Sequence, residues 1–249
     1  MNIPLKRAEE LALMRVSCRL TAEVLAAVAA AVAPGVTTGE LDQLARRLIE
    51  ERNAKPSFLG YRKYPAAMCI SINDEVIHGI PGRRVVQPGD VVSLDVGVYK
   101  DGFHGDCATT VMVGVTDPDV IRLVETTRRA LAAGIAAARP GGRLSDVSHA
   151  VQSIVEASGC SVVREFVGHG VGRHLHEDPQ VPNYGKPGYG PVLKPGMTLA
   201  IEPMVNLGKG SVCVLDDGWT VVTKDGKPSA HFEHTVAVLE ESVEVLTLA

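Results

Sequence analysis

The chain has 249 residues, of which 45% are apolar and 22% are charged, and its formal net charge is −4. This is the composition of an ordinary globular protein, and it lacks the basic excess that nucleic-acid-binding proteins show. The five cysteines are widely spaced and none forms a CxxC pair, which argues against a disulfide framework or a structural zinc site. We therefore expect a reducing, cytoplasmic setting and no specificity for nucleic acid.

The most apolar run covers residues 24–33 and is mostly alanine. A membrane-spanning helix needs roughly 20 apolar residues, so this run is too short to cross a bilayer. It follows Glu9, Glu10 and Glu23, acids that a secretory signal peptide would not carry ahead of its apolar run. We predict that the run ends a helix and that the protein has no membrane partner.

Hydrophobic periodicity, helix caps and Gly/Pro positions predict the secondary structure. In chain order, the predictions are helices over 5–33 and 38–52, strands and loops over 55–90, strands over 91–98 and 103–113, helices over 118–138 and 143–158, and then strands with Gly/Pro-rich loops. The expected buried face of the first helix is Leu5, Leu13, Val16, Leu20, Val24 and Val28. The second helix would be capped by Thr37 or Thr38 and would bury Leu41, Leu44 and Leu48.

The sequence contains an internal repeat. Residues 34–41 resemble residues 140–147, and residues 87–95 resemble residues 194–202, at offsets of 106 and 107. The second pair places an acid seven residues after the proline of each copy. A Pro-Gly pair is common before strands and helices, but two matches at nearly one offset favour duplication. Because no flexible linker divides the halves, we predict one α+β domain over residues 1–249, with a site between them.

Four acids interrupt apolar segments, and these are Asp95, Asp106, Glu202 and Glu233. Burying an unpaired carboxylate is costly, so the folded chain must protonate it, pair it or bind it to a metal. One such acid is more often a solvated strand residue, but four in similar settings, two of them related by the repeat, favour a metal site. Four carboxylates carry four negative charges, which two divalent ions would neutralise.

Two of these acids flank a predicted hairpin turn at residues 99–102. If the turn is centred between Lys100 and Asp101, Asp95 lies directly opposite Asp106. Like charges at that distance repel, and a divalent cation between them would remove the conflict.

The candidate histidine ligand is His169, whose flanking glycines let the backbone approach a ligand closely. A histidine in such a place is often only a loop residue, but the following His-Glu-Asp-Pro at 176–179 strengthens the hypothesis. An oxygen-rich site with a histidine suits Mn, Fe(II), Co or Zn, and the sequence does not choose among them.

Residues 167–181, Val-Gly-His-Gly-Val-Gly-Arg-His-Leu-His-Glu-Asp-Pro-Gln-Val, resemble the histidine motif of the methionine aminopeptidases. Residues 69–81, 93–107, 193–204 and 233–235 resemble further motifs of that family, in the same order and over nearly the whole chain. The resemblance implies the pita-bread fold, an α+β fold of two pseudo-symmetric halves in which helices cover a curved antiparallel sheet. Only 32 residues separate His169 from Glu202, which favours the short type I form.

The resemblance implies a set of metal ligands, Asp95, Asp106, His169, Glu202 and Glu233. Asp106 and Glu233 would bridge two divalent ions. Water held between the ions would attack the carbonyl carbon of the substrate methionine, with Glu202 acting as base. His176 would stabilise the tetrahedral intermediate, and His78 would contact the peptide beyond the cleaved bond.

The resemblance also implies a methionine pocket, which would be lined by Phe58, Tyr61, Tyr64, Cys69 and Trp219. A thioether suits a soft, aromatic, cysteine-lined cavity, although ordinary core packing is an alternative role for each residue. Phe58 stands where bacterial relatives often have a smaller residue, and Leu175 stands where an aromatic residue is expected. Pocket width and inhibitor preference are therefore open.

Three other histidines lie near the predicted ligands in the sequence. His104 and His231 are two residues from an acid and share its strand face, whereas His234 would point to the other face. None of the three is assigned to metal.

The resulting hypothesis is an enzyme that removes the initiator methionine from nascent proteins with small second residues. Its partners would be nascent N-termini, with transient ribosome contact and a monomeric state implied by the family. One alternative is a proline-specific aminopeptidase or dipeptidase of the same fold, but such proteins usually carry a long N-terminal domain. A non-catalytic pita-bread binding protein is the other, but it would be expected to have lost ligands.

Overall fold

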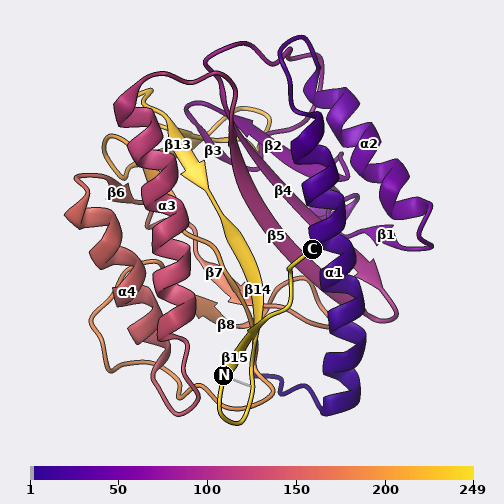
Figure 1. Ribbon diagram of the computed structural model, residues 1–249, viewed down its shortest axis with the longest axis vertical. Helices are drawn as coiled ribbons and strands as arrows, with labels where there is room; N and C mark the ends of the chain where they lie inside the picture. Colours follow the sequence, from indigo (N-terminus) through magenta and orange to yellow (C-terminus); the bar gives the residue numbers. More distant parts are fainter. Residues whose placement is uncertain (1–2) are drawn as a thin grey trace.

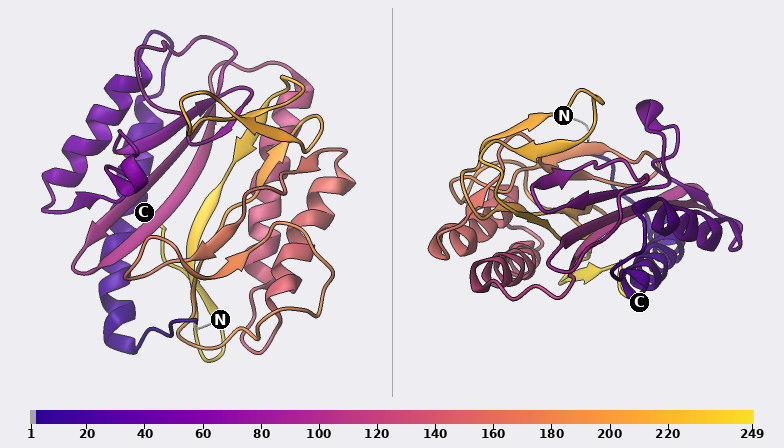
Figure 2. Two further views of the ribbon diagram at one scale, coloured as in Figure 1. Left: turned by 180° about the vertical axis from the view of Figure 1, so that it is seen from behind. Right: turned by 90° about the horizontal axis from the view of Figure 1, so that it is seen from above.

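A curved sheet forms the centre of the molecule, and four long helices cover one of its faces (Figures 1 and 2). The computed structural model describes residues 3–249. The helices are α1 (Ala8–Ala31), α2 (Thr38–Glu50), α3 (Pro118–Ala137) and α4 (Leu144–Ala157), and a short 3-10 helix, η1, covers Tyr61–Lys63. In residues 3–249, no helix has the length and apolar character needed to span a membrane.

Within residues 3–249, fifteen short or medium strands complete the secondary structure. They are β1 (Lys55–Pro56), β2 (Met68–Ile72), β3 (Glu75–Ile77), β4 (Val91–Lys100), β5 (Phe103–Met112), β6 (Ser161–Val162), β7 (Gly168–Gly170), β8 (Glu177–Val181), β9 (Thr198–Ile201), β10 (Met204–Asn206), β11 (Val212–Val214), β12 (Val221–Thr223), β13 (Ser229–His231), β14 (Glu233–Val238) and β15 (Val243–Val245).

The main sheet joins the two halves of the sequence. Its order is β1-β4-β5-β14-β9-β7-β8, with β2 beside β4 and β15 beside β14. The antiparallel seam between the halves is β5 against β14, where Glu233 pairs with Ala108 and His234 with Cys107. The strands that carry the repeated Pro-Gly segments, β4 and β9, therefore lie on opposite sides of the seam. Two three-stranded sheets, β13-β10-β6 and β11-β12-β3, complete the fold.

Each half has its own aliphatic core. In the first half, α1 and α2 pack on β2 and β4 through residues such as Val24, Leu41 and Leu94. In the second half, α3 and α4 pack on β9 and β14 through residues such as Leu123 and Leu199. Burial of these side chains, at about 25 cal/mol per Å² of apolar surface, holds the helices on one face of the sheet.

The buried face of α1 differs from the prediction. Leu20, Val24 and Val28 are buried as expected, but the predicted residues of the N-terminal half, Leu5, Leu13 and Val16, are 50%, 40% and 44% exposed. The helix instead buries a second stripe at helical spacing, which is Leu11, Met14, Cys18, Thr21, Leu25 and Val28. Small residues on this stripe let the helix approach β5 closely at Gly105, and the sequence pattern alone gave no reason to prefer them.

The second helix matches its prediction closely. Thr37 is the N-cap, because its hydroxyl accepts a hydrogen bond from the Glu40 amide at 3.2 Å and the Glu40 carboxylate binds back to the Thr37 amide. Leu41 is fully buried, and Leu44 and Leu48 pack against the same core. The remaining predicted helices and the strands β4 and β5 fall within a few residues of their expected bounds.

The hairpin register differs from the prediction by two residues. Lys100 pairs with Phe103, so Asp95 lies opposite Ala108 and Asp106 lies opposite Gly97. Asp101 and Gly102 both have positive φ, 52° and 90°, which is the two-residue turn that an Asp-Gly pair favours. A shift of two residues keeps each side chain on its original face, so the two acids remain neighbours.

Gly105 provides a test of the α1–β5 contact. A Cβ atom at this position would lie 2.7 Å from Cys18 Cα and 2.6 Å from Thr21 Oγ1. We expect Gly105→Ala to lower the free energy of unfolding by about 1–3 kcal/mol, measured by urea denaturation. Gly82→Ala is the control, because a Cβ there would meet no atom within 4 Å. Equal stabilities for the two variants would contradict this account of the packing.

Candidate metal centre

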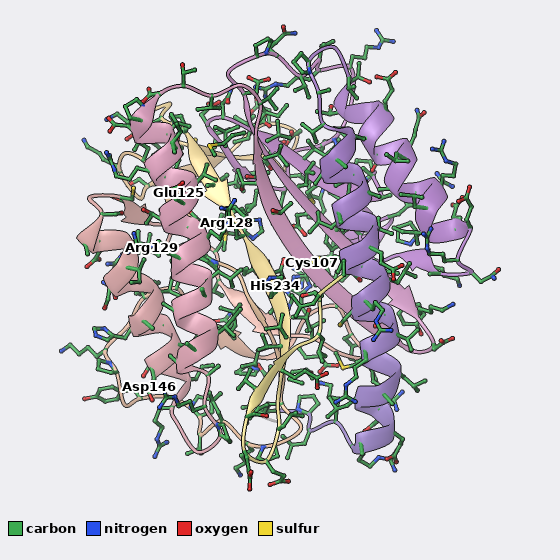
Figure 3. The ribbon with its side chains drawn as sticks, viewed as in Figure 1. Cys107, Glu125, Arg128, Arg129, Asp146 and His234 are labelled. Carbon is green, nitrogen blue, oxygen red and sulfur yellow. The ribbon has the colours of Figure 1, made fainter. Side chains whose placement is uncertain are left out.

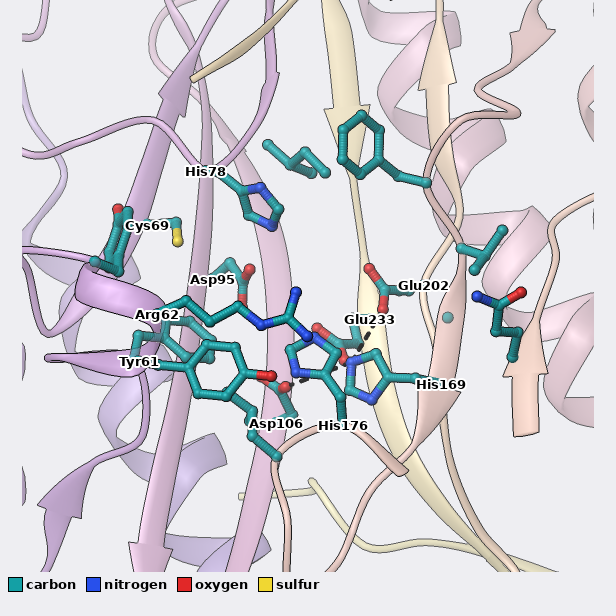
Figure 4. Close-up of a pocket in the computed structure, with 18 of the residues that line it drawn as sticks. Tyr61, Arg62, Cys69, His78, Asp95, Asp106, His169, His176, Glu202 and Glu233 are labelled. Atoms are coloured by element: carbon teal, nitrogen blue, oxygen red, sulfur yellow. Dashed lines mark ion pairs between the residues drawn. The ribbon is translucent and has the colours of Figure 1, made fainter. Parts of the chain in front are cut away.

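The four predicted acids lie on four adjacent strand positions at the middle of the sheet (Figure 4). Asp95 lies on β4, Asp106 on β5, Glu233 at the start of β14, and Glu202 directly after β9. The two acids nearest the seam come from different halves, as do the two outer acids that the repeat relates. Each half thus delivers two carboxylates to one place.

His169 joins this cluster from β7, which pairs with β9. Its Nε2 atom lies 3.4 Å from Glu202 Oε1 and 3.9 Å from Asp106 Oδ2. Its Nδ1 atom lies 2.9 Å from the Gly170 carbonyl oxygen, which can only accept a hydrogen bond. Nδ1 must therefore carry the proton, which leaves the Nε2 lone pair directed at the acids, as a metal-binding histidine requires.

Both glycines beside His169 are needed for close strand packing. A Cβ atom at Gly168 would collide with the Ala200 carbonyl oxygen of β9, and one at Gly170 would collide with the Asp178 carbonyl oxygen of β8. The Gly-His-Gly motif therefore seats the imidazole between two close neighbouring strands.

The electrostatics of the acids are unfavourable without a cation. Burial raises the pKa of Asp95 to about 7 and that of Glu202 to about 8. Burial and then the neighbouring carboxylates hold the pKa of Asp106 and of Glu233 well above their usual range. Within residues 3–249, Asp95 Oδ1, Asp106 Oδ1 and Glu233 Oε1 are buried oxygens with no hydrogen-bond partner. Such orphaned oxygens fit a divalent ion.

Ligand atoms cluster in two groups that share one residue. Asp106, His169 and Glu233 offer atoms within 4.8 Å of one another, and so do Glu202, His231 and Glu233. A carboxylate that belongs to both groups is suited to bridge two ions.

His231 is the residue of this group that sequence analysis left unassigned. Its Nε2 atom is buried without a hydrogen-bond partner and lies 3.4 Å from Glu202 Oε2. Its two-residue spacing from Glu233 was the available signal. By contrast, His104 Nδ1 lies 2.8 Å from Ser57 Oγ rather than at an acid.

The opposite face of the seam carries a different set of side chains. His234 and Cys107 lie between α1 and α3, on the helix-covered side of the sheet (Figure 3). His234 Nδ1 lies 2.9 Å from Thr247 Oγ1. The prediction from strand alternation that His234 points away from the acids is confirmed.

A cavity of about 570 Å³ adjoins the acids. The predicted pocket residues Phe58, Tyr61, Tyr64, Cys69 and Trp219 all line it, and so does Leu175. Tyr64 is fixed by its hydroxyl, 2.9 Å from the Gly79 carbonyl oxygen, and by an edge contact to the Trp219 ring at 5.1 Å. Phe58 and Leu175 are 8% and 3% exposed, so both form wall rather than rim.

The two predicted catalytic histidines lie on either side of this cavity. His176 stacks on Tyr61, with ring centroids 5.2 Å apart, and lies 4.2 Å from the His169 ring. His78 makes edge contacts with Phe166 and Trp219, and its φ of 60° is unusual for a residue with a side chain. Burial lowers the pKa of His78 to about 4 and that of His176 to about 3, so both rings are neutral at neutral pH.

Arg62 is a lining residue that sequence analysis missed. Its side chain extends over the cavity beside Tyr61 (Figure 4). Arg62 and Lys63 have positive φ, 47° and 74°, which no sequence pattern here indicates. Phe166 was also missed, because it lies in a loop without a motif of its own.

Comparison with known proteins identifies the family. Residues 12–240 match the model of metallopeptidase family M24, and the chain is 51% identical over 242 residues to methionine aminopeptidase 1 of Bacillus subtilis, covering 97% of this chain and 98% of that protein. The chain belongs to the methionine aminopeptidases of family M24. It is also 46% identical over 250 residues to the methionine aminopeptidase of Escherichia coli, covering 100% of this chain and 95% of that one.

Solved structures confirm the fold of this methionine aminopeptidase family member. The crystal structure of methionine aminopeptidase from Thermotoga maritima matches with a TM-score of 0.98 and 46% identity over 100% of both chains. Prolidase from Pyrococcus furiosus, 21% identical, shares the fold with a TM-score of 0.79. The matched region covers 98% of this chain and 65% of the prolidase. The predicted pita-bread α+β architecture is confirmed, and divalent metal use follows from the family.

The raised pKa values predict a pH dependence of the metal-free protein. Between the unfolded pKa of about 4 and the folded values of about 7 for Asp95 and about 8 for Glu202, the folded state binds more protons, so its stability falls as pH rises. The buried histidines, with pKa values lowered from 6.5, oppose this only below about pH 6.5.

We therefore expect the free energy of unfolding of metal-free protein to fall between about pH 6.5 and pH 8, as measured by urea denaturation. The double variant Asp95→Asn, Glu202→Gln should show a weaker slope. A wild-type stability that stayed constant or rose over this range would contradict the assignment of strained carboxylates.

Proposed function

We propose that the chain hydrolyses the peptide bond after an N-terminal methionine, with two divalent ions at the acid cluster and with nascent proteins and peptides as substrates. Relatives that are 51% identical over nearly the whole chain and are named methionine aminopeptidases support the removal of methionine as its activity. The observation that carries the two-ion assignment is the group of buried, partnerless carboxylate oxygens beside an apolar cavity. Small second residues are expected for the substrate.

Five residues would hold the ions, and these are Asp95, Asp106, His169, Glu202 and Glu233. Asp106 and Glu233 would bridge, because they lie nearest the seam and Glu233 belongs to both donor groups. When bound, the ions would supply Lewis acidity toward the methionine carbonyl and a water that deprotonates near neutral pH. Mn, Fe(II), Co and Zn all suit this donor set.

Side chains of the protein would manage the protons and the developing charge. Glu202 would accept the proton of the attacking water, since its two oxygens face the cluster between His169 and His231. The neutral His176 ring, held by Tyr61, would donate a hydrogen bond to the oxygen that becomes negative in the tetrahedral intermediate. His78, across the cavity, would contact the peptide beyond the cleaved bond.

The apolar end of the cavity would take the methionine side chain. Phe58, Tyr64 and Trp219 offer ring surface to the thioether, and Cys69 offers a thiol. Burial raises the pKa of Cys69 well above its usual range, so the thiol remains protonated and serves as a soft wall rather than as a nucleophile.

Two alternatives share the fold but are less well supported. Prolidase from Pyrococcus furiosus matches at 21% identity, whereas the methionine aminopeptidases of Bacillus subtilis and Escherichia coli match at 51% and 46%. A non-catalytic protein would have little use for two groups of converging donors, Asp106, His169 and Glu233, and Glu202, His231 and Glu233. A monomeric state, a cytoplasmic location and transient contact with the ribosome follow from the proposed role and stay predictions.

The deciding experiment uses metal-stripped protein titrated with Mn, Co, Fe(II) and Zn. Release of the first methionine from Met-Gly-Met-Met, with no cleavage of X-Pro dipeptides, is the expected result. Met-Pro-Gly tests the tolerance for proline as the second residue. If none of the metals supports release of methionine, the proposed activity is wrong.

Single substitution of a bridging acid should separate chemistry from folding. Glu233→Ala and Asp106→Ala should lower kcat/KM by at least about 10³-fold, because each removes a shared ligand of both ions. Calorimetric titration of the apo variants should show fewer bound ions, while circular dichroism shows a folded protein. Glu241→Ala, an exposed acid, is the control. Full activity in either variant would refute the metal assignment.

Phe58 should set the width of the methionine pocket. Its ring packs against Gly97, where a Cβ atom would lie 2.7 Å from Phe58 Cε1. We expect Phe58→Ala to raise kcat/KM for bulkier first residues relative to methionine by about tenfold, because a changed apolar volume alters discrimination by this order. Competition assays between Met-Gly and Phe-Gly peptides measure the ratio. An unchanged ratio would mean that Phe58 does not limit the pocket.

A further inference from the structure

A buried ion pair links the beginning of the chain to the loop that carries His176. Lys6 Nζ contacts Glu177 Oε2, and both side chains are 4% exposed. Glu177 is the first residue of β8 and directly follows His176. Neither partner belongs to the metal cluster. A buried charge pair persists only where its geometry and further hydrogen bonds compensate the loss of water, so its other contacts are informative.

Glu177 holds the loop in a tight conformation. Its Oε1 atom accepts a hydrogen bond from the His174 amide at 3.1 Å. The Gly172 amide donates to the His174 carbonyl oxygen at 3.0 Å, and the Gly172 carbonyl oxygen accepts from the His104 amide of β5 at 2.8 Å. One carboxylate therefore connects β8, the turn before it and, through that turn, the strand that carries Asp106.

Lys6 is fixed at both of its ends. Its amide donates to the Gly196 carbonyl oxygen at 2.7 Å, just before β9. At the other end the side chain passes over Gly172, where a Cβ atom would lie 2.6 Å from Lys6 Nζ and 2.8 Å from Glu177 Oε1. Only glycine at position 172 leaves room for the ammonium group to reach its partner.

The ring of His176 is held by contacts that do not fix its backbone. Tyr61 stacks on one side and His169 lies on the other. Neither contact is a hydrogen bond to the ring or its backbone, so the position of the ring relative to the acids depends on where Glu177 anchors the chain. We propose that Lys6, acting through Glu177, is a positioning residue for His176, an inference that rests on the proposed function.

The test begins with Lys6→Met, which keeps the length of the side chain and removes its charge. We expect kcat for Met-Gly-Met-Met to fall about tenfold or more, because displacement of a reacting group by about 1 Å can cost 10²-fold. KM should change little. Mn(II) binding to the apo variant, followed by electron paramagnetic resonance, should match wild type. Arg7→Met is the matched control, because Arg7 is exposed and pairs with Glu9 on the surface.

Two further variants separate positioning from stability. The double variant Lys6→Met, Glu177→Met leaves no unpaired buried charge, so it should fold and bind Mn(II) while keeping the low kcat. In a His176→Ala background, Lys6→Met should cause no additional loss of kcat, since a residue that acts through His176 has nothing left to position.

Three results would overturn the proposal. These are wild-type kcat in the double variant, an undiminished effect of Lys6→Met in the His176→Ala background, or an equal loss in Arg7→Met. If the wild-type protein releases no methionine with any of the four metals, the proposed function is refuted instead. If the wild type is active and only the effect of Lys6→Met is missing, the positioning proposal alone is refuted.

Discussion

The burial of four acids beside one another, two of them fully and two of them largely, is the constraint on which the rest of the molecule depends. Strand pairing forces these acids together at the seam, where their pKa values rise and several oxygens lack partners. The apolar cores behind each half must offset this cost in the metal-free protein. On the proposed assignment, a bound cation would make the interaction favourable, and the residues that weaken the metal-free fold would become its ligands. The stability of the fold and the proposed catalysis therefore both depend on the electrostatic energy of the same clustered acids.

The two halves contribute to this site equally but complete it differently. Each supplies one inner and one outer carboxylate through related strands. The second half adds His169 and the loop with His176, and the first half adds Tyr61, Tyr64 and Cys69 to the cavity wall. The shared strand framework would thus hold the ions, whereas the segments that differ between the halves line the cavity. The outer acids, Asp95 and Glu202, follow the repeat, and the cavity-lining residues do not.

The acids could be predicted from the sequence because a charged residue inside an apolar strand has a high cost of desolvation and is recognisable from its immediate neighbours. The sequence predicted Asp95 and Asp106 as neighbours but misplaced their register, because the Asp-Gly pair at 101–102 forms the turn. It chose the wrong residues in the N-terminal half of α1, since Gly105 decides that contact from a distant strand. The Lys6–Glu177 pair joins residues 171 apart, which no periodicity connects. An unfavourable residue in its local sequence can be recognised from the sequence alone, whereas packing between residues far apart in the chain cannot.

The seam itself is narrow. Over the described chain, the ladder between β5 and β14 pairs two positions, and the Thr235 hydroxyl adds bonds to both backbone groups of Asp106, at 2.8 and 3.2 Å. The Thr110 hydroxyl likewise bonds to both backbone groups of His231, at 2.7 and 3.0 Å, so side-chain hydroxyls extend this short ladder. Ions shared by Asp106 and Glu233 would cross-link the two halves at this seam. Binding of the ions would then reduce the movement of one half relative to the other, including in regions far from the ligands. The flexibility of the whole molecule would therefore depend on whether the metal centre is occupied.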